Sequence, residues 1–566
     1  KKNSTMNHPW TAHYPAGIPA EINPDTFASI PALFDEVAKT HGNRTAFVCL
    51  RKSISYKEVN ALSTRFAGYL QSLGLEPGDR VAVMMPNLTQ YMIALLGILR
   101  AGLIAVNVNP LYTAHELAHQ LKDSGAKAVV IIENFAKTLE TALPETKVKH
   151  IITTKVGDML PWHQRLLTDF VIRYVKKMVP EFNLPNCVNF RDALAIGKHH
   201  GFAPVALKNN DIALLQYTGG TTGVAKGAML THRNVLANVE QTGTWISQTF
   251  EVGKEIAMTA LPLYHIFSFT ATLCFAKKAA TQVLVPNARD IPGLAALMDQ
   301  WNFTIISGVN TLFNALINNK QFQAHKFGHL KMTVGGGTQV QKAVAEKWAK
   351  VTGCPILEAY GLTETSPGVC GNLPGAPWDG SVGYPIPSTE VTIRSDDFKD
   401  LGLCSDPEKI SDYTGEICVK GPQVMLGYWE KPEETANVLV DGWLKTGDVG
   451  YMDAEGKITI TDRKKDLIIV NGLNVYPNEI ENVIASMPGV LECGVTGVKH
   501  PKVGEIVKAV IVKKDPALTR EDVVKYCRAR MTGYKCPRTV VFVKAMPKTP
   551  VGKILRRELK DLKDGD

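Results

Sequence analysis

Short apolar runs rich in β-branched residues alternate with helix-like segments over the first 350 or so positions of the chain. The runs that predict strands are RVAVMM, LIAVNV, KAVVII, HIITT, DIALLQY, TQVLV, FTIISGV and KMTVGGG. Segments with helical periodicity lie between several of them, for example VNALSTRFAGYLQSLG and AHELAHQLKDSG. Strands that alternate with helices favour parallel sheets covered by helices, so the predicted fold class is α/β.

Beyond about residue 400 the pattern changes to short strands with glycine turns. GEICVKGPQVMLGYW and GYMDAEGKITITDR predict antiparallel strands, and AEG predicts a hairpin turn. From residue 467 onward, strands and helices form a compact α+β pattern. We therefore predict a large N-terminal domain over residues 1–464, β-rich from about residue 380, and a small mobile C-terminal domain over residues 465–566.

Length and composition restrict the class of protein. A chain of 566 residues is too long for one core. Its net charge of +9 is too diffuse to argue for nucleic acid, but it suits polyanionic small molecules or an anionic membrane. The ten cysteines include no C-x-x-C pair, which predicts free thiols in a reducing cytoplasm. The longest apolar run, YMIALLGILRAGLIAVNV, contains Gly97, Arg100 and Gly102, so no transmembrane helix is predicted.

The segment WHQRLLTDFVIRYVKKMV, residues 162–179, predicts a basic amphipathic helix. Its apolar positions are Leu166, Leu167, Phe170, Val171, Tyr174 and Met178, and its cations are Arg165, Arg173, Lys176 and Lys177. Such a helix either packs on its own domain with a solvated basic edge or rests on an anionic membrane. The second alternative predicts peripheral attachment to the cytoplasmic face of the inner membrane.

The stretch QYTGGTTGVAKGAMLTH, residues 216–232, has the composition of a phosphate-binding loop. It does not match the nucleotide-hydrolysing template, in which the lysine directly follows the last glycine. Its glycines let backbone N–H groups converge on an anion, its threonines add hydroxyl donors, and Lys226 supplies a positive charge. The sequence alone leaves a flexible polar turn as the alternative.

Four further motifs have compositions that suit nucleotide binding. EAYGLTETSP supplies the Tyr360 ring, the Thr363 hydroxyl and the Glu364 carboxylate, and an oxygen ligand of this kind suits Mg²⁺. VGGG, residues 334–337, gives a wall without side chains. GWLKTGD places Asp448 where its two oxygens could bridge ribose hydroxyls. PKTPVGKILRREL places Lys553 after a Pro/Gly turn, and each motif taken singly also fits an ordinary turn.

The chain resembles the adenylate-forming superfamily over residues 27 to 560. The resemblance rests on five motifs that occur in the same order: YTGGTTGVAKG, YGLTET, GWLKTGD, DRKKDLI and PKTPVGKI. ALPLYHIFS, GVNTLFNAL, KGPQVMLGYW and GYKCPRTVVF resemble its bacterial long-chain-fatty-acid–CoA ligases. The resemblance implies that a fatty carboxylate attacks the α-phosphorus of ATP, giving an acyl-adenylate and pyrophosphate, and that CoA then displaces AMP. ATP, Mg²⁺ and coenzyme A are the implied cofactors, and a homodimer is compatible with it.

The resemblance also implies residue roles. Its catalytic residues are Lys553, Glu364, Thr363 and His265, with His265 resembling an aromatic gate or else a core histidine. Mg²⁺ would bind Glu364 and Thr218. The nucleotide and CoA would contact Tyr217, Thr218, Gly219, Gly220, Thr221, Thr222, Gly223, Lys226, Gly335, Gly336, Gly337, Glu358, Ala359, Tyr360, Asp448, Arg463, Gly472, Leu473 and Asn474. Lys465 matches the hinge position.

Other functions remain open from the sequence. The first is a nucleotide-binding scaffold without activity, which the joint presence of Lys553, Glu364 and Asp448 disfavours. The second is an aryl-CoA or medium-chain ligase of the same superfamily. A peptide-synthetase module is disfavoured because YHIFSF has no aspartate for a substrate amine. Chain-length preference is expected to depend on packing around GVNTLFN.

Overall fold

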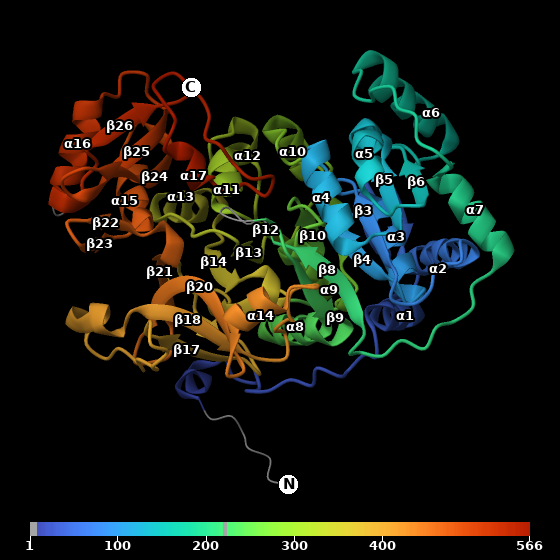
Figure 1. Ribbon diagram of the computed structural model, residues 1–566, viewed down its shortest axis with the longest axis horizontal. Coiled ribbons are helices and arrows are strands. Elements are labelled where there is room, and N and C mark those ends of the chain that lie inside the picture. Colours follow the sequence, from blue (N-terminus) through green and yellow to red (C-terminus); the bar gives the residue numbers. More distant parts are fainter. Residues whose placement is uncertain (1–7, 219–223, 532) are drawn as a thin grey trace, which may run out of the picture.

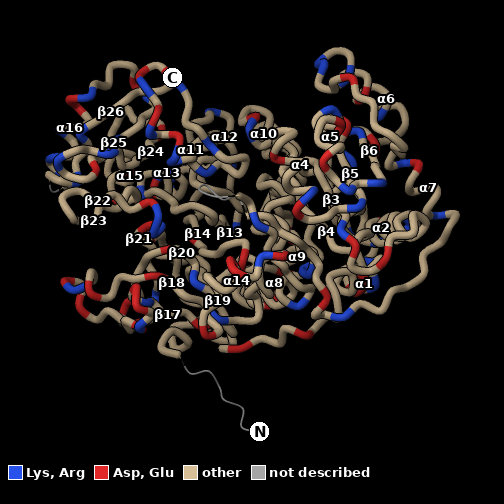
Figure 2. Tube along the Cα trace, in the orientation of Figure 1, with Lys and Arg blue, Asp and Glu red and all other residues tan. Residues whose placement is uncertain are grey.

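The computed structural model describes residues 8–218, 224–531 and 533–566 (Figure 1). Among these residues the strands form four β-sheets with helices on their faces, which confirms the predicted α/β fold class. The predicted phosphate-loop residues Gly219, Gly220, Thr221, Thr222 and Gly223 lie outside the described residues. Lysine and arginine residues are interspersed with aspartate and glutamate residues along the trace in Figure 2.

A seven-stranded sheet has the order β7-β6-β5-β3-β4-β8-β9. All neighbouring strand pairs in this sheet are parallel except β8 and β9, which pair antiparallel. The predicted phosphate loop is the segment of sequence between these two strands. The strands are β3 (Arg80–Met84), β4 (Ile104–Asn107), β5 (Ala128–Ile132), β6 (His150–Thr154), β7 (Cys187–Asn189), β8 (Ile212–Tyr217) and β9 (Gly227–Thr231).

A nine-stranded sheet has the order β16-β15-β14-β13-β12-β10-β11-β1-β2. Its parallel centre carries the glycine wall and the EAYG motif at the carboxyl ends of neighbouring strands, where ligands bind in such sheets. The strands are β1 (Thr45–Cys49), β2 (Lys52–Ser55), β10 (Ile256–Thr259), β11 (Thr281–Leu284), β12 (Ile305–Gly308), β13 (Met332–Gly335), β14 (Ile356–Gly361), β15 (Gly368–Gly371) and β16 (Tyr384–Pro385).

Helices cover both sheets. They are α1 (Ile30–His41), α2 (Tyr56–Ser72), α3 (Thr89–Arg100), α4 (Ala114–Ser124), α5 (Ala136–Ala142), α6 (Trp162–Phe170), α7 (Phe190–His200), α8 (His232–Trp245), α9 (Ile266–Lys277), α10 (Ile291–Met298), α11 (Asn310–Ile317), α12 (Lys320–Ala324) and α13 (Lys342–Thr352). Every residue of α3 is buried, and α3 contacts β3 of one sheet and β1 of the other. The long apolar run is therefore a core helix followed by strand β4. No helix among the described residues has the length and apolarity that crossing a bilayer requires.

The third sheet is antiparallel. It contains β17 (Glu390–Arg394), β18 (Gly415–Lys420), β19 (Leu439–Val440), β20 (Trp443–Met452) and β21 (Ile458–Arg463), with α14 (Pro432–Val438) beside it. The hairpin predicted over GYMDAEGKITITDR is confirmed as β20 and β21. GEICVKGPQVMLGYW is a strand only in its first six residues, because Gly421 and Pro422 follow at once and proline cannot donate to a ladder.

The fourth sheet has a core of its own in the C-terminal region. Its strands are β22 (Ile468–Val470), β23 (Leu473–Val475), β24 (Val490–His500), β25 (Gly504–Lys513) and β26 (Thr539–Phe542), with helices α15 (Pro477–Ala485), α16 (Arg520–Arg528) and α17 (Arg556–Leu559). A single 3₁₀ turn, η7 (Lys464–Asp466), connects the third sheet to the fourth. This turn contains Lys465, whose role as a hinge stays a prediction.

Candidate active site

A cavity of about 1080 Å³ brings together side chains from all five motifs of the chain. The predicted residues that line it are Tyr217, Thr218, Lys226, His265, Gly336, Gly337, Glu358, Ala359, Tyr360, Thr363, Glu364, Asp448, Arg463, Lys465 and Lys553. They come from both large sheets, the third sheet and the C-terminal domain. Gly335 and the loop Gly472, Leu473 and Asn474 do not line it.

Close packing of neighbouring side chains leaves no room for a Cβ atom at two positions of the glycine wall. A Cβ atom at Gly336 would come within 2.7 Å of the Phe267 ring, and one at Gly335 within 2.8 Å of Val340. Gly337 has φ +76°, a conformation that side chains rarely adopt, and a Cβ there would lie 3.6 Å from Lys553 Cε. The wall therefore gives room for a flat group beside the Lys553 side chain.

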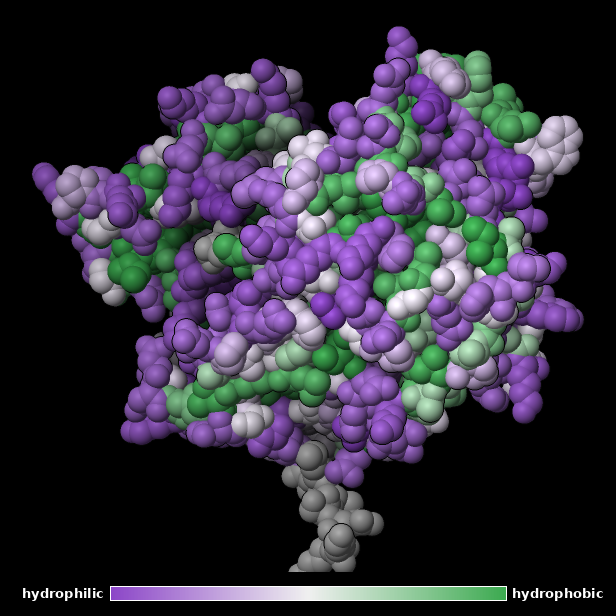
Figure 3. All heavy atoms as spheres, turned by 45° about the vertical axis from the view of Figure 1, so that its right-hand side comes forward, coloured by the Kyte–Doolittle hydropathy of each residue, from purple (hydrophilic) through white to green (hydrophobic). Residues whose placement is uncertain are grey.

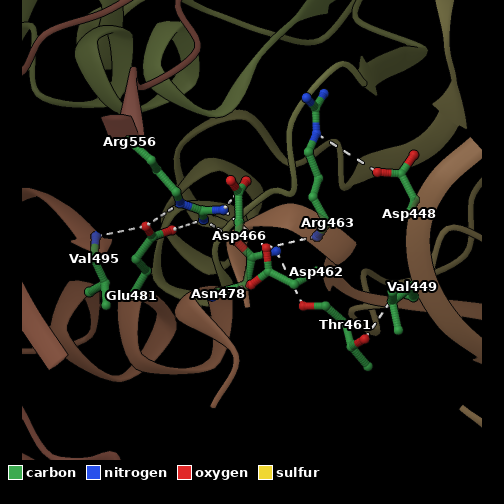
Figure 4. Close-up of polar contacts among 10 residues, drawn as sticks. All are labelled: Asp448, Val449, Thr461, Asp462, Arg463, Asp466, Asn478, Glu481, Val495 and Arg556. Atoms are coloured by element: carbon green, nitrogen blue, oxygen red, sulfur yellow. Dashed lines mark hydrogen bonds and ion pairs between the residues drawn. The ribbon is translucent and has the colours of Figure 1, made fainter. Parts of the chain in front are cut away.

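Tyr360, Asp448 and Arg463 form a polar corner of the cavity. The Tyr360 hydroxyl donates to Asp448 Oδ2 at 2.6 Å. Arg463 Nε lies 3.8 Å from Asp448 Oδ1, a contact drawn in Figure 4. Burial raises the pKa of Asp448, while Arg463 and the Tyr360 hydrogen bond oppose this rise. The corner holds a carboxylate in a fixed position next to an aromatic ring. A carboxylate can bind ribose hydroxyls, and an aromatic ring can lie against a base.

A second contact chain joins the phosphate loop to the predicted metal ligand. The Tyr428 hydroxyl donates to Glu364 Oε1 at 2.7 Å, and the Lys226 ammonium lies 4.5 Å from the centre of the Tyr428 ring. At the base of the loop, Thr218 N donates to the Lys226 carbonyl at 2.9 Å. One tyrosine thus aligns a cation and a carboxylate on the same side of the cavity.

Glu358 braces the wall from behind. Its carboxyl oxygens accept hydrogen bonds from Val340 N and Trp378 Nε1, each at 2.9 Å. The residue is buried, and burial raises its pKa to about 8. Its side chain therefore fixes the position of Val340 next to the glycines.

Lys553 reaches the cavity from the C-terminal domain. The Thr311 hydroxyl on α11 donates to the Gly552 carbonyl at 2.8 Å, and the Thr549 hydroxyl accepts from Lys553 N at 3.0 Å. Burial, with a smaller contribution from Arg463, lowers the pKa of Lys553 to about 8, although Asp448 and Glu364 act in the opposite direction. A protonated lysine in this setting places a positive charge in the cavity lining beside Gly337.

The apolar end of the cavity lies between α8 and α9. It is lined there by Asn238, Thr242, Trp245, Ile246, Thr270, Ala271, Cys274 and Phe275, with Met332 and Val334 of β13. Of the GVNTLFN segment, expected to govern tunnel depth, only Asn310 and Thr311 line the cavity. Phe313 instead packs against Trp348 in the core, because α11 turns its apolar face inward.

His265 stands where the polar and apolar parts of the cavity meet. It caps the N-terminus of α9, and its Nδ1 accepts a hydrogen bond from Phe267 N at 3.3 Å. Burial lowers its pKa to about 3, and the nearby Lys553 adds to this effect. The ring is therefore neutral, which suits a wall or gate rather than a proton donor at neutral pH.

The Gly472 to Asn474 loop does not line the cavity that Lys553 enters. Asn471 and Gly472 both have positive φ and form the tight turn between β22 and β23. Leu473 is 48% exposed. The structure thus places Lys553, and not this loop, in the cavity.

Sequence reasoning assigned no role to Tyr428 or Trp378. Tyr428 lies in KGPQVMLGYW and contacts positions 64 and 202 residues earlier, so no local pattern could identify its partners. Trp378 stands in a loop between β15 and β16. A glycine followed by two aromatic residues at Tyr428 was the available signal, because an aromatic pair after a turn is unusual on a solvated surface.

The residues present fit a magnesium ion that is shared with phosphates. No group of three or more His, Cys, Asp or Glu side chains with metal-binding geometry occurs in the described parts of the chain. Glu364 is a carboxylate that lines the cavity together with Thr218 and Lys226, and Mg²⁺ at nucleotide sites binds one or two carboxylates plus phosphate oxygens. Thr218 offers a hydroxyl from the same side.

Comparison with protein families extends these observations over the whole chain. A family described as "AMP-binding enzyme" matches residues 34–429, and one described as "AMP-binding enzyme C-terminal domain" matches residues 479–553. The two matches include the motifs that hold Lys226, Glu364 and Lys553, whereas the GWLKTGD motif and the DRKKD turn lie between them.

Individual relatives match over nearly their full length. The chain is 50% identical to a long-chain-fatty-acid–CoA ligase of Escherichia coli O157:H7, with 98% of both chains covered. It is 37% identical to a long-chain-fatty-acid–CoA ligase of Bacillus subtilis (strain 168), with 97% of both covered. Among solved structures, ATP-bound MatB from Rhodopseudomonas palustris is 28% identical, with a TM-score of 0.79 and coverage of 94% of this chain and 98% of that one. The resemblance inferred from the motifs is confirmed.

Proposed function

The chain belongs to the AMP-binding enzyme family, and we propose that it is a long-chain-fatty-acid–CoA ligase that works through an acyl-adenylate. The observation that carries this function is one cavity with a polar end formed by five motifs and an apolar end between two helices. ATP and CoA are substrates of the reaction. The fatty carboxyl group would lie where the two ends meet.

In the first step a carboxylate oxygen forms a bond to the α-phosphorus of ATP, and the bond to the bridging oxygen of pyrophosphate breaks. The reaction needs alignment and positive charge more than covalent help from the protein. We assign the charge to Lys553, and to Lys226 for the departing phosphates. Asp448 and Tyr360 would hold the nucleoside, and neutral His265 would border the carboxyl group.

In the second step the CoA sulfur forms a bond to the acyl carbon, and the bond to the AMP oxygen breaks. The loop Gly472 to Asn474 is the group that resembles a pantetheine-contacting segment, yet it lies outside the cavity. Lys553 and this loop are on one domain, so they would take turns at the adenylate if that domain rotates about η7.

Magnesium belongs to this proposal as a cofactor held by Glu364 and Thr218. When bound, it would neutralise charge on the phosphates of ATP. The Tyr428 hydroxyl holds the Glu364 carboxylate in place through a hydrogen bond, and the Tyr428 ring also contacts Lys226.

Glu364→Gln should raise the Mg²⁺ concentration needed for half-maximal adenylation at least about tenfold, the lower end of what disturbing the outer shell of a metal does. An amide oxygen still accepts from Tyr428 but is a poorer ligand for a hard cation. Titration of pyrophosphate release against Mg²⁺ measures this. Glu434→Gln, which alters another carboxylate lining the cavity, is the control. An unchanged titration for Glu364→Gln would remove Glu364 from the metal site.

A substrate panel tests the acyl preference. With ATP and CoA present, we expect oleate and palmitate to give acyl-CoA, AMP and pyrophosphate at far higher kcat/KM than acetate, octanoate or coumarate. Octanoate or coumarate as best substrate would favour the medium-chain or aryl-CoA alternatives. No product with any acid would favour a binding scaffold.

We also propose peripheral attachment to an anionic membrane through α6 and the π-helical turn η4 (Val171–Val175). The predicted helix over residues 162–179 ends near residue 175, because Lys177 has positive φ. Its apolar side is not packed on the domain: the exposed residues are Trp162, Leu166, Leu167, Phe170, Tyr174, Val175 and Met178, at 52–68%. In Figure 3, hydrophobic side chains (green) gather on the lobe at the upper right, which carries α6 in Figure 1.

Polar contacts hold the other side of this helix to the domain. Asp169 accepts from Gly157 N at 3.1 Å, and Arg173 lies 3.6 Å from Glu133. Lys176 and Lys177 are exposed next to the apolar stripe, and each cation near an anionic surface contributes about 1 kcal/mol. An exposed apolar stripe with flanking cations fits a lipid surface. A reducing cytoplasm suits the ten cysteines, none of which is in a disulfide in the described residues.

Leu166→Asp combined with Phe170→Asp should lower binding to anionic vesicles at least about tenfold, since burying one such side chain contributes about 1.5–3 kcal/mol. Flotation with phosphatidylglycerol-containing vesicles at low and high salt measures the bound fraction. Val252→Asp replaces an apolar side chain that is 53% exposed elsewhere and should leave binding unchanged. Absence of binding by the unaltered chain at low salt would end the membrane proposal.

The homodimer stays a prediction, which the mass of the chain in solution tests.

A further inference from the structure

Arg556, three residues after Lys553, occupies the centre of an ionic cluster in which Asp462 is fully buried and Arg556 itself is largely buried. Its guanidinium donates to Glu481 Oε2 and Asp462 Oδ1, each at 3.0 Å, to Asp466 Oδ2 at 3.3 Å and to Asn478 Oδ1 at 2.5 Å (Figure 4). A further bond runs from Nε to Glu481 Oε1 at 3.2 Å. Every donor direction of the arginine is thus directed at a carboxylate or an amide oxygen.

The partners of Arg556 belong to two sides of η7. Glu481 and Asn478 are on α15 of the C-terminal domain, whereas Asp462 is on β21 of the third sheet. The Asp462 side chain is 1% exposed and also accepts from Asn478 N at 3.0 Å. Burial raises the pKa of Asp462, and Arg556 opposes that rise. The contact between Asp462 and Arg556 therefore spans the turn that connects the two domains.

The contact between Glu481 and Arg556, in contrast, lies within one domain. Both residues are in the C-terminal domain, and Glu481 Oε1 also accepts from Val495 N at 2.9 Å on β24. A rotation about η7 would carry Glu481, Asn478 and Arg556 together. The same rotation would separate all three from Asp462, which stays with β21.

We infer that Arg556, through Asp462, is a positioning residue that fixes the C-terminal domain in the orientation that places Lys553 in the cavity. The inference rests on the proposed function for its enzymatic readout. Asp462 precedes Arg463, which borders Asp448, so one strand end holds both the polar corner and the support for Lys553. A buried arginine pair is sensitive to loss of either charge, because the remaining charge stays unpaired.

Asp462→Asn is the test variant, since it keeps the side-chain shape and an oxygen acceptor but removes the charge. We expect acyl-adenylate formation to fall between about 10- and 100-fold, as for a small misplacement of a reacting group. Thioester formation from supplied acyl-adenylate should stay at the normal rate, because that step does not use Lys553. Arg556→Lys should act in the same direction, because an ammonium lacks the planar fork of the guanidinium.

Glu481→Gln is the matched control within the same cluster. It weakens the pairing of the same arginine inside one domain, so it should lower the melting temperature without separating the two half-reactions. Equal losses in both half-reactions for Asp462→Asn and Glu481→Gln would overturn the inference in favour of a purely structural cluster.

A measurement without catalysis separates this inference from the proposed function. Trypsin cleavage after Lys464 or Lys465 in the full chain reports how firmly the domains are held across η7. We expect Asp462→Asn to speed cleavage severalfold relative to the unaltered chain and to Glu481→Gln. If the unaltered chain makes no adenylate, the proposed function fails and the cleavage rates alone decide the inference. Equal cleavage of Asp462→Asn and the unaltered chain would overturn it.

Discussion

Lys553→Ala should lower the rate of acyl-adenylate formation by about 10²- to 10³-fold, the range seen when one group that stabilises developing charge is removed. Lys553 is the lysine that the C-terminal domain extends beside Gly337. Its ammonium is needed while negative charge develops at the α-phosphate. Thioester formation from supplied acyl-adenylate should stay near normal, because Lys553 has no part in that step.

Two half-reactions measured separately check this expectation. Pyrophosphate exchange reports the first step, and acyl-CoA made from synthetic acyl-adenylate reports the second. Lys548→Ala is a control on the same loop, because Lys548 pairs with Glu492 and does not line the cavity. Equal loss in both half-reactions for Lys553→Ala would mean a damaged fold or a different role.

The pH profile gives a second readout of the same lysine. With a pKa of about 8, Lys553 is protonated below that pH and neutral above it. Since kcat/KM reports groups of the free enzyme, kcat/KM for adenylation should fall as the pH rises through about 8. Lys553→Ala should lack this descending limb in its residual activity.

Lys465→Pro should lower thioester formation at least about 10²-fold while adenylation keeps much of its rate. Lys465 is in a 3₁₀ turn, where φ lies close to the value of about −65° that the proline ring imposes. The variant therefore suits the present orientation of the C-terminal domain. It resists the φ change that would bring the Gly472 to Asn474 loop to the adenylate.

Lys465→Ala leaves φ free and should be mild in both steps, so it controls for loss of the side chain. Circular dichroism and the melting temperature establish that the proline variant is folded. Acyl-CoA formation from acyl-adenylate at the normal rate by a folded Lys465→Pro chain would contradict the hinge hypothesis.

Much of the site is predictable because its motifs are local. A glycine-rich loop after a strand, or a carboxylate after a glycine turn, has a physical meaning that does not depend on distant residues. Lys226, Glu364, Asp448 and Lys553 could therefore be proposed from their own neighbourhoods. The structure places all four in one cavity.

The contacts between motifs were not predictable in the same way. Tyr428 joins Lys226 to Glu364 because its segment lies along β9, where Met229 N donates to the Gly427 carbonyl at 2.8 Å and Trp429 N donates to the Gly227 carbonyl at 2.7 Å. Arg556 contacts Asp462 across 94 residues of sequence. Such contacts depend on how domains are placed, and periodicity carries no information about that placement.

The amphipathic segment at residues 162–179 also shows what periodicity does not predict. Its period predicts which positions share a face, but an apolar face looks alike in sequence whether a neighbouring sheet or solvent covers it. The polar contacts of Asp169 and Arg173 decide the matter, because they turn the opposite face toward the domain.

The central claim is that a fatty carboxylate oxygen bonds to the α-phosphorus of ATP before CoA reacts. Oleate labelled with ¹⁸O in its carboxyl group tests this directly when the chain turns it over with ATP, Mg²⁺ and CoA. The account predicts one ¹⁸O atom in each AMP and none in pyrophosphate, because thiolysis breaks the bond between the acyl carbon and that oxygen. Oleoyl-CoA formed with unlabelled AMP, or with the label in a phosphate other than that of AMP, would contradict it.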